Sequence, residues 1–287
     1  MVTLALVGAG QWGKNYLGAA RQIEGVEITY ITTSHTDIEG VPRKLDGVII
    51  ASPAKTHYAL AKHFLEDGRN ILVEKPLALS VAEANALQES AKKSGSKVLV
   101  GHLQLYNPAY RAAKALVPSL GEVKKISFRG LVSPPRKDVS VLWDWGPHPA
   151  SLFLDLIDTP LKDVSADGNN EHVTFELTFG SGTTATAEIG WEGLEKKREL
   201  IIQGTEGKIT FDDTKREQKV MVELHGKSPS FPSYDQTPPL TIQLTEFVSA
   251  IRDGEKIYSG IETGVRVTEL LARVKAEVFK HSLQRIE

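Results

Sequence analysis

The chain begins MVTLALVGAGQWG (residues 1–13), a short apolar run followed by the pattern Gly-x-Gly-x-x-Gly. The run predicts a buried strand and residues 14–23 have helical character, so the glycines join a strand to a helix. There Gly8 permits a tight turn, Gly10 lets a phosphate approach the backbone, and Gly13 lets helix and strand pack closely. The helix N-terminus adds N–H groups without acceptors. We therefore expect a dinucleotide pyrophosphate at Gly8, Gly10, Gln11, Trp12 and Gly13, with a plain strand–helix turn as the alternative.

Strands and helices alternate after this turn. Strands are predicted at 26–32, 47–51, 70–73 and 97–100, and helices at 56–67 and 80–94. Ser80 is the expected N-cap of the second helix, and Glu83 completes a capping box. The alternation predicts parallel βαβ units and hence a doubly wound Rossmann sheet. Only about fourteen residues (33–46) separate two of the strands, too few for a helix and a further strand. We expect a shortened second half-unit with one irregular crossover.

From about residue 120 onward, strands follow one another without helices between them. Strands are predicted at 123–131, 172–179, 183–191, 198–203, 208–211 and 219–224, and helices at 148–157, 244–253 and 261–281. Such a run of strands favours a largely antiparallel open sheet, so the fold class is α/β with a C-terminal α+β domain. The predicted domains are 1–118, which binds the dinucleotide, and 119–287, onto which the substrate and other subunits bind. The last helices are free to pack back on the first domain.

The end of the second strand bears on the choice of dinucleotide. An NAD site usually has an acid there, which binds both ribose hydroxyls. Here the stretch contains Thr33, Ser34 and His35, and the first acid is Asp37. Hydroxyls and an imidazole tolerate a 2′-phosphate, and Asp37 could still reach the ribose. The expected cofactor is NAD or NADP, with a slight preference for NADP.

Composition excludes several kinds of protein. The formal net charge is −2 and the basic residues are scattered, which argues against nucleic acid or an anionic membrane as a partner. The chain has no cysteine, so disulfides, thiolate zinc sites and cysteine nucleophiles are excluded. The sequence contains no His-x-x-x-His pair, and we expect no metal site. Residues 1–7 read as a strand instead of a secretion signal, and a cytoplasmic location is the default expectation.

Four further motifs occur in an order that resembles one family. They are Ser52-Pro53 with Thr56-His57, then Glu74-Lys75-Pro76, the stretch Gly101–Pro108 (GHLQLYNP), and Asp144-Trp145-Gly146-Pro147-His148. Together they resemble motifs of the Gfo/Idh/MocA oxidoreductases, named after glucose–fructose oxidoreductase and inositol dehydrogenase. The resemblance covers essentially the whole chain. It implies hydride transfer between a nicotinamide and a sugar, nucleotide sugar or cyclic polyol.

The resemblance also implies roles for single residues. Lys75 would donate a hydrogen bond to the reacting oxygen, His148 would act as general acid and base, and Asp144 would orient it. This agrees with general chemistry, since an imidazole exchanges protons near neutrality and a cation stabilises an alkoxide. Pro147 and Pro149 predict that a regular helix starts only at Pro149. Further cofactor contacts are expected from Ser52, Pro53, His57, Glu74 and Lys75, and substrate contacts from His102, Gln104, Tyr106, Asn107, Arg136 and Trp143.

The chain departs from the family pattern at Leu105, where the family has Arg, and at Ser151, where an acid is frequent. Several residues also have plain structural interpretations: Asn107 is a good helix cap before Pro108, and His57 and His102 are as readily core histidines. Two other functions stay open, namely a non-catalytic dinucleotide or sugar sensor and an imine or enone reductase. The family implies a homodimer or homotetramer that assembles through the C-terminal sheet.

Overall fold

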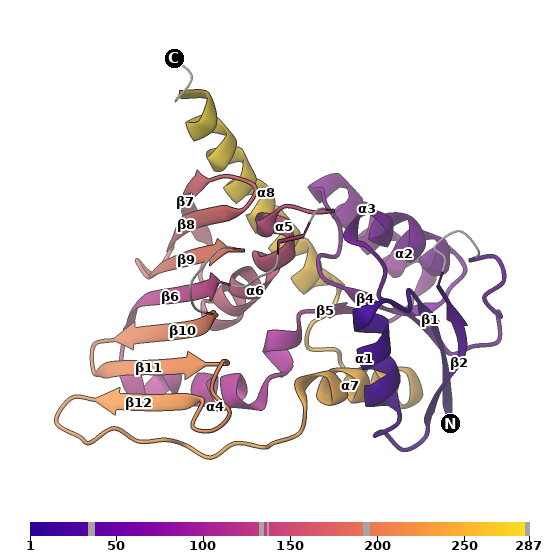
Figure 1. Ribbon diagram of the computed structural model, residues 1–287, viewed down its shortest axis with the longest axis horizontal. Coiled ribbons are helices and arrows are strands. Elements are labelled where there is room, and N and C mark those ends of the chain that lie inside the picture. Colours follow the sequence, from indigo (N-terminus) through magenta and orange to yellow (C-terminus); the bar gives the residue numbers. More distant parts are fainter. Residues whose placement is uncertain (34–37, 132–134, 137, 192–195, 285–287) are drawn as a thin grey trace. The chain divides into compact units, whose positions relative to one another are not determined.

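The computed structural model describes residues 1–33, 38–131, 135–136, 138–191 and 196–284, the last four of them as backbone only. The chain divides into two compact units (Figure 1). Unit 1 comprises Met1–Tyr106 and Thr237–Glu269, and unit 2 comprises Asn107–Gln236 and Leu270–Glu287. Helix α8 (Ile261–Gln284) contributes its first part to unit 1 and its last part to unit 2.

Unit 1 is built on a five-stranded, entirely parallel sheet with the order β2-β1-β3-β4-β5. Strands β1, β3, β4 and β5 are almost wholly buried, which agrees with their apolar sequences, whereas the edge strand β2 alternates half-buried and exposed residues. On one face they pack against α2 and α3, and on the other against α1 and α7 (Figure 1). The elements are β1 Val2–Val7, α1 Gln11–Ala20, β2 Val26–Thr32, β3 Gly47–Ile50, α2 His57–Glu66, β4 Asn70–Glu74, α3 Val81–Ser94, β5 Val98–Gly101 and α7 Pro239–Asp253, with 3₁₀ turns at Ala54–Thr56 and Leu103–Tyr106.

The predicted Rossmann sheet and its shortened half are both confirmed. Between β2 and β3 the described residues, 33 and 38–46, contain no helix. Instead Asp46 anchors the returning chain, because its carboxylate accepts hydrogen bonds from the Thr3 N–H at 2.7 Å and hydroxyl at 2.8 Å. The capping box of α3 differs slightly from the prediction. Ser80 accepts from the Glu83 N–H at 3.3 Å, but the Glu83 carboxylate accepts from Leu79, one residue before the cap.

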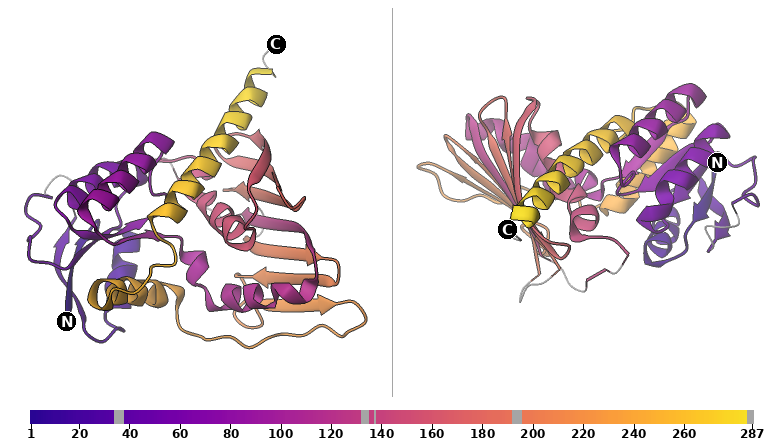
Figure 2. Two further views of the ribbon diagram at one scale, coloured as in Figure 1. Left: turned by 180° about the vertical axis from the view of Figure 1, so that it is seen from behind. Right: turned by 90° about the horizontal axis from the view of Figure 1, so that it is seen from above.

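Unit 2 is built on a seven-stranded sheet with the order β12-β11-β10-β6-β9-β8-β7, antiparallel except for the pair β6 and β9. Helices α4, α5 and α6 lie on one face of it (Figure 2). Most strands alternate buried residues on that face with more exposed, mainly polar residues on the other. The elements are α4 Pro108–Leu116, the 3₁₀ turn Val117–Leu120, β6 Val123–Leu131, α5 Val141–Trp145, α6 Pro147–Leu156, β7 Leu161–Gly168, β8 His172–Phe179, β9 Thr184–Gly190, β10 Lys197–Gly204, β11 Gly207–Asp212 and β12 Val220–Leu224.

The open, largely antiparallel sheet is confirmed, but one of its strands is missing from the prediction. β7 lies at the edge of the sheet and pairs only with β8. Its buried side chains are few and small, mainly Val164 and Ala166, and they alternate with Asp163, Ser165 and Asp167. A strand with so little apolar surface has almost no periodic signal in the sequence.

The prediction that a helix starts only at Pro149 is wrong. α6 begins at Pro147, and Gly146 joins it to α5 with helical angles of φ −54° and ψ −33°. The N–H of Ala150 already donates to the Gly146 carbonyl at 3.1 Å. Both prolines fit because they lie in the first turn of α6, where a backbone N–H has no acceptor within the helix. Residues 141–156 are therefore almost continuously helical.

Among the described residues, no helix has both the length and the apolar character that crossing a membrane requires. The described residues likewise bring together no group of three metal-ligating side chains.

Candidate functional site

The glycine-rich turn has three glycines in three different environments. Gly8 has φ +97°, and a Cβ there would lie 2.6 Å from the Ala51 carbonyl oxygen; at Gly13 it would lie 2.1 Å from that of Gly8. These two glycines are required because strand and helix pack this closely. At Gly10 a Cβ would meet nothing within 4 Å. The backbone of Gly10 is thus open to an approaching ligand, whereas Gly8 and Gly13 lock the turn from inside.

The open side of the turn carries hydrogen-bond donors. Gly10 is the N-cap of α1, and its carbonyl accepts from Lys14 at 3.0 Å. Gln11, Trp12 and Gly13 form the first turn of α1, and their backbone N–H groups have no acceptor within the helix. Trp12 lies beside them with 39% of its surface exposed. An accessible glycine backbone at the positive end of a ten-residue helix fits the pyrophosphate of a dinucleotide.

Further residues were predicted to contact the cofactor at the ends of β2 and β3. Thr33, directly after β2, is exposed, while Ser34, His35 and Asp37 fall outside the described residues. After β3, Ser52 is half-buried and Pro53 exposed, and the Ser52 hydroxyl lies 2.7 Å from that of Thr56. The described part of this edge, at Thr32 and Thr33, has no acid.

His57 holds two loops together. It is 1% exposed, and its ring nitrogens lie at hydrogen-bond distance from two backbone carbonyls: Nδ1 is 2.7 Å from Pro76 O and Nε2 2.9 Å from Ser52 O. The ring therefore fastens the loop after β3 to the loop after β4. Both ring nitrogens of His57 are therefore directed at the main chain of these two loops.

Glu74 ends β4 in a buried polar network that sequence reasoning missed. Its carboxylate accepts from the Tyr16 hydroxyl at 2.7 Å and the Lys75 N–H at 3.2 Å, and Gln243 donates to the Tyr16 oxygen at 3.1 Å. The carboxylate needs the space left by Gly101, where a Cβ would lie 3.1 Å from it. Burial raises the pKa of Glu74, although the Tyr16 hydrogen bond and the Lys75 charge oppose the change. Burial, and secondarily Glu74, raise the pKa of Tyr16.

Lys75 and His102 come directly after two paired strands. Lys75 is half-buried, and the peptide bond that joins it to Pro76 is cis. His102 is 1% exposed, and its Nδ1 lies 2.9 Å from the Ser259 hydroxyl. Burial above all, and then the positive charge of Lys75, lower the pKa of His102 to about 3. The imidazole is therefore neutral at physiological pH.

Two other residues of the GHLQLYNP stretch are part of the framework. Tyr106 is fully buried and donates to a Glu246 carboxylate oxygen at 2.6 Å, whereas Gln104 is half-buried. Asn107 belongs to unit 2, where it caps α4 by accepting from Ala109 at 3.0 Å and also donates to Asp213 at 3.0 Å. These contacts fit the helix-cap interpretation of Asn107, because both ends of its amide are engaged within unit 2.

Asp144 and His148 are four residues apart on the helical segment of α5 and α6. This spacing places their side chains on the same side of the helix. Asp144 is 7% exposed; Arg136 pairs with it at 3.2 Å, and the Trp191 indole donates to it at 3.4 Å. The His148 ring is half-buried and lies 4.9 Å from the Trp145 ring, centre to centre.

Arg136 and Trp143, both predicted to contact substrate, are already engaged within unit 2. Arg136 binds both oxygens of Asp138, at 2.7 and 3.0 Å, which with Asp144 raises the pKa of the guanidinium. Trp143 is only 6% exposed. It lines a pocket of about 660 Å³ between α5, the end of β7 and α8, together with Leu142, Asn169, Asn170, Val173 and Phe279.

Comparison with known proteins identifies the family. A family model described as an oxidoreductase family with an NAD-binding Rossmann fold matches residues 29–102. The chain is 29% identical to scyllo-inositol 2-dehydrogenase (NAD(+)) of Bacillus subtilis strain 168, over 74% of this chain and 69% of that protein. It is 32% identical to 4-carboxy-2-hydroxymuconate-6-semialdehyde dehydrogenase of Sphingobium sp. SYK-6, over 96% and 99%. An oxidoreductase structure from Magnetospirillum magnetotacticum MS-1 is 31% identical in sequence to this chain and superposes on it with a TM-score of 0.83. The match covers 95% of this chain and 99% of that one.

Both near-complete matches exceed 30% identity, and the fold agrees along the chain. These similarities favour an enzyme over a sensor without turnover. The chain belongs to the Gfo/Idh/MocA oxidoreductase family and is an NAD(P)-dependent dehydrogenase.

Proposed function

We propose that this dehydrogenase interconverts a hydroxyl and a carbonyl group on a sugar, nucleotide sugar or cyclic polyol. The observation that carries the proposal is the open backbone at Gly10, in a turn locked by Gly8 and Gly13, on the sheet whose strand β4 leads into Lys75. The name of the Bacillus subtilis relative supports a cyclic polyol as one candidate. A nicotinamide bound at the glycine-rich turn would supply the acceptor and donor of the hydride.

The chain's own residues supply the proton chemistry in this proposal. Lys75 donates a hydrogen bond to the substrate oxygen and stabilises its negative charge as the proton leaves. His148 removes that proton in oxidation and returns it in reduction, a role for which imidazole is suited near neutral pH. Asp144, on the same side of the helix, orients the His148 ring. Lys75 belongs to unit 1 and His148 to unit 2.

We further propose NADP as the preferred dinucleotide. The support is the described end of β2, where Thr32 and Thr33 provide no carboxylate for the ribose hydroxyls. Titrations of the protein with NADH and with NADPH, followed by energy transfer from Trp12, measure both affinities. Tighter binding of NADH would reverse the preference, and binding of neither would refute the cofactor site.

The variant Gly10→Ala tests the turn directly. A methyl group at Gly10 meets no protein atom within 4 Å, so the fold tolerates it, but it occupies the space through which the pyrophosphate approaches. We expect the dinucleotide Kd to rise at least about tenfold, or about 1.4 kcal/mol, with an unchanged melting temperature. Gly18→Ala is the matched control, because Gly18 is exposed in the same helix and also has open space. Equal binding by both variants would contradict the proposed site.

A second candidate substrate class is favoured by the similarity over nearly the whole chain to a semialdehyde dehydrogenase. A hydrated aldehyde, like a sugar, presents a carbon that bears both a hydrogen and a hydroxyl group, so the same residues serve both. Reduction of NAD and NADP should be assayed with scyllo-inositol, free sugars, nucleotide sugars and 4-carboxy-2-hydroxymuconate-6-semialdehyde. Activity with the semialdehyde alone would select the second class.

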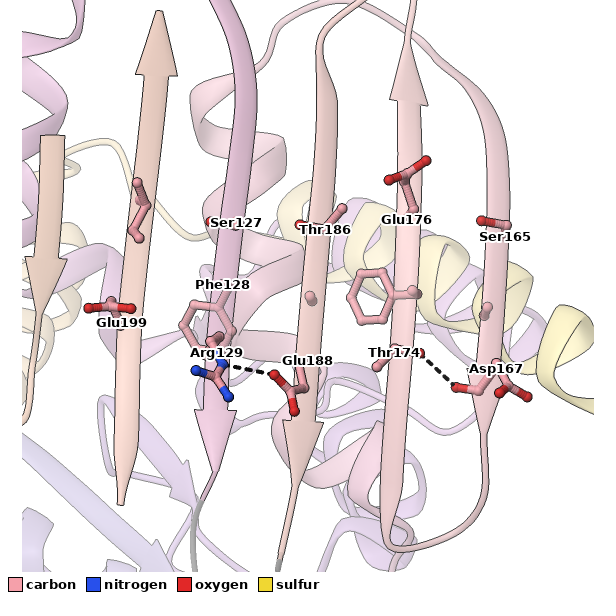
Figure 3. Close-up of a pocket in the computed structure, with 14 residues that line it drawn as sticks. Ser127, Phe128, Arg129, Ser165, Asp167, Thr174, Glu176, Thr186, Glu188 and Glu199 are labelled. Carbon is pink, nitrogen blue, oxygen red and sulfur yellow. Dashed lines mark hydrogen bonds and ion pairs between the residues drawn. The ribbon is translucent and has the colours of Figure 1, made fainter. Parts of the chain in front are cut away.

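We also propose that the chain forms a homodimer or homotetramer through the polar face of the sheet in unit 2. Figure 3 shows this face, where a shallow pocket of about 510 Å³ is lined by Ser127, Arg129, Thr174, Glu176, Thr186, Glu188 and Glu199. The Arg129–Glu188 ion pair, 2.8 Å long, is part of its lining. Light scattering in solution measures the mass, and a monomer would refute the proposal.

A further inference from the structure

His102 has one ring nitrogen with a partner and one without. Nδ1 lies 2.9 Å from the Ser259 hydroxyl, while Nε2 has no hydrogen-bond partner among the residues that the structure describes. The residue is 1% exposed, so water cannot readily replace the missing partner. A buried polar atom without a partner costs free energy, and a ligand or a movable side chain that supplies the partner is one explanation.

Ser259 is held firmly in place to meet the ring. It is completely buried; its carbonyl accepts from the Val100 N–H at 2.8 Å, and its N–H donates to the Tyr106 hydroxyl at 3.2 Å. These bonds attach the segment before α8 to the edge strand β5, directly beside His102. The orientation of the imidazole is therefore set by the framework of unit 1.

The strand register places Lys75 next to His102. Glu74 and Gly101 are paired residues of β4 and β5, and each is followed by one of the two residues in question. Neighbouring strands lie about 4.8 Å apart. The charge of Lys75 also contributes to keeping His102 neutral. The Lys75 ammonium thus acts on a neutral ring, which has one lone pair and one N–H.

The position of the ring proton follows from this charge. A proton on Nε2 would bury an N–H without an acceptor and direct its positive end into the field of Lys75. A proton on Nδ1 is accepted by the Ser259 hydroxyl oxygen and leaves the Nε2 lone pair, which a nearby cation favours. The Nδ1–H tautomer is the more stable of the two.

We propose that His102 is a positioning residue for Lys75: Ser259 holds its ring proton on Nδ1, and Nε2 accepts a hydrogen bond from the Lys75 ammonium in the dinucleotide-bound enzyme. The inference rests on the proposed role of Lys75 at the substrate oxygen. An ammonium held on one side by a neutral acceptor has its remaining N–H groups directed to the other side. His102 itself then needs no contact with the substrate.

Nitrogen-15 NMR of the full chain labelled on histidine tests the tautomer and the contact without any turnover. In wild type we expect the Nδ1–H tautomer from pH 5 to 9. With saturating NADPH, the Nε2 resonance of Lys75→Met should lie downfield of wild type, since the nitrogen has lost a hydrogen bond. Lys97→Met, an exposed lysine before the other end of β5, is the control and should leave the resonance unchanged. A proton on Nε2, or no difference in Lys75→Met, would overturn the proposal.

Kinetics then separates positioning from packing. With a substrate from the panel above, His102→Leu should lower kcat about tenfold to a hundredfold, the effect of losing one hydrogen bond to a charged group, with little change in dinucleotide Kd. His102→Gln, whose amide oxygen replaces the Nε2 lone pair, should restore most of kcat. Ser259→Ala should lower kcat less, and Thr268→Ala, which also removes a buried hydroxyl from unit 1, should not. Equal loss in the Gln and Leu variants would refute the positioning role.

The two experiments fail independently. If no compound in the panel is turned over, the proposed function is wrong, yet the NMR spectra still decide the state of His102. If turnover is found but Nε2 does not respond to Lys75, only the positioning role is refuted.

Discussion

Glu74 and Asp144 each stand close in sequence to a residue proposed to act in catalysis, and each is 7% exposed. The two buried carboxylates are stabilised by different kinds of partner. Glu74 receives hydrogen bonds from neutral groups, the Tyr16 hydroxyl and the Lys75 N–H, whereas Asp144 pairs with the Arg136 guanidinium and the Trp191 indole. Equal burial therefore does not mean equal electrostatics.

The difference shows where each carboxylate gets its support. The donors of Glu74 come from the core of unit 1, so its environment is as rigid as the packing of α1 and α7, and burial still raises its pKa. Asp144 depends in part on an arginine whose side chain is 41% exposed, and water and salt weaken such a pair. Glu74 is thus tied to folding, and Asp144 is more easily adjusted to a ligand.

The largest effect is expected beside Asp144, at His148. His148→Asn removes the proposed acid and base, so kcat should fall about a hundredfold to ten-thousandfold. Dinucleotide affinity should be nearly unchanged, because the turn at Gly8–Gly13 lies in unit 1. Steady-state kinetics and a fluorescence titration measure the two quantities. His172→Asn, on a half-buried histidine of unit 2 paired with Glu188, is the control; equal activity of both variants would remove His148 from the mechanism.

An intermediate effect is expected beside Glu74. Tyr16→Phe removes a hydrogen bond that lowers the pKa of this carboxyl, so the pKa in the folded state rises further above its ordinary value of 4.5. Below that pH Glu74 is protonated in both states and the cost is small; it grows as the pH rises and the buried group must ionise. Near neutral pH the free energy of unfolding should fall by about 1–3 kcal/mol.

Urea unfolding at pH 5 and pH 8 measures this pH dependence. Tyr110→Phe is the matched control in unit 2, because the hydroxyl of Tyr110 also donates to a carboxylate, that of Asp155, which Lys114 pairs with as well. The loss of unfolding free energy caused by Tyr110→Phe should change less between pH 5 and pH 8. A Tyr16→Phe cost that is the same at both pH values would show that Glu74 stays protonated or that its network rearranges.

The smallest effect is expected for Arg136→Met. Its guanidinium is 41% exposed, so water can take its place beside the buried Asp144 carboxylate, which also keeps the Trp191 indole as a donor; we expect a loss of about 1 kcal/mol or less. The stability lost in Arg136→Met should be smaller still in 0.5 M salt, and the same holds for Arg129→Met on the sheet face. Thermal unfolding of both variants and wild type at low and high salt measures these differences. A loss that exceeds that of Tyr16→Phe would reverse the comparison of the two carboxylates.

The sequence predicted those parts of the fold whose residues lie close together along the chain. The buried runs of β1 and β4, the glycine turn and the alternating strands β6 and β8 all have short-range periodicity. β7 was missed because its buried residues are small, and the helix at His148 was misplaced because prolines were treated as breakers although they lie in a first turn.

The candidate site divides in the same way. The motifs identified Lys75, Glu74 and His102 as residues of interest, but not their partners. Tyr16 and Gln243 are far from Glu74 in sequence, and Ser259 is 157 residues from His102. No pattern in one sequence indicates which distant polar side chains will meet in a core.

By itself, then, the sequence determined the parallel sheet, the strand–helix turn with its three glycines and the family to which the chain belongs. All three depend on residues close together along the chain, where steric limits on the backbone and hydrophobic periodicity act directly. Only the tertiary structure decided that His57 fastens two loops, that Asn107 caps a helix, and that Ser259 meets His102. Those roles depend on burial and on partners from distant segments, which exist only once the chain has folded.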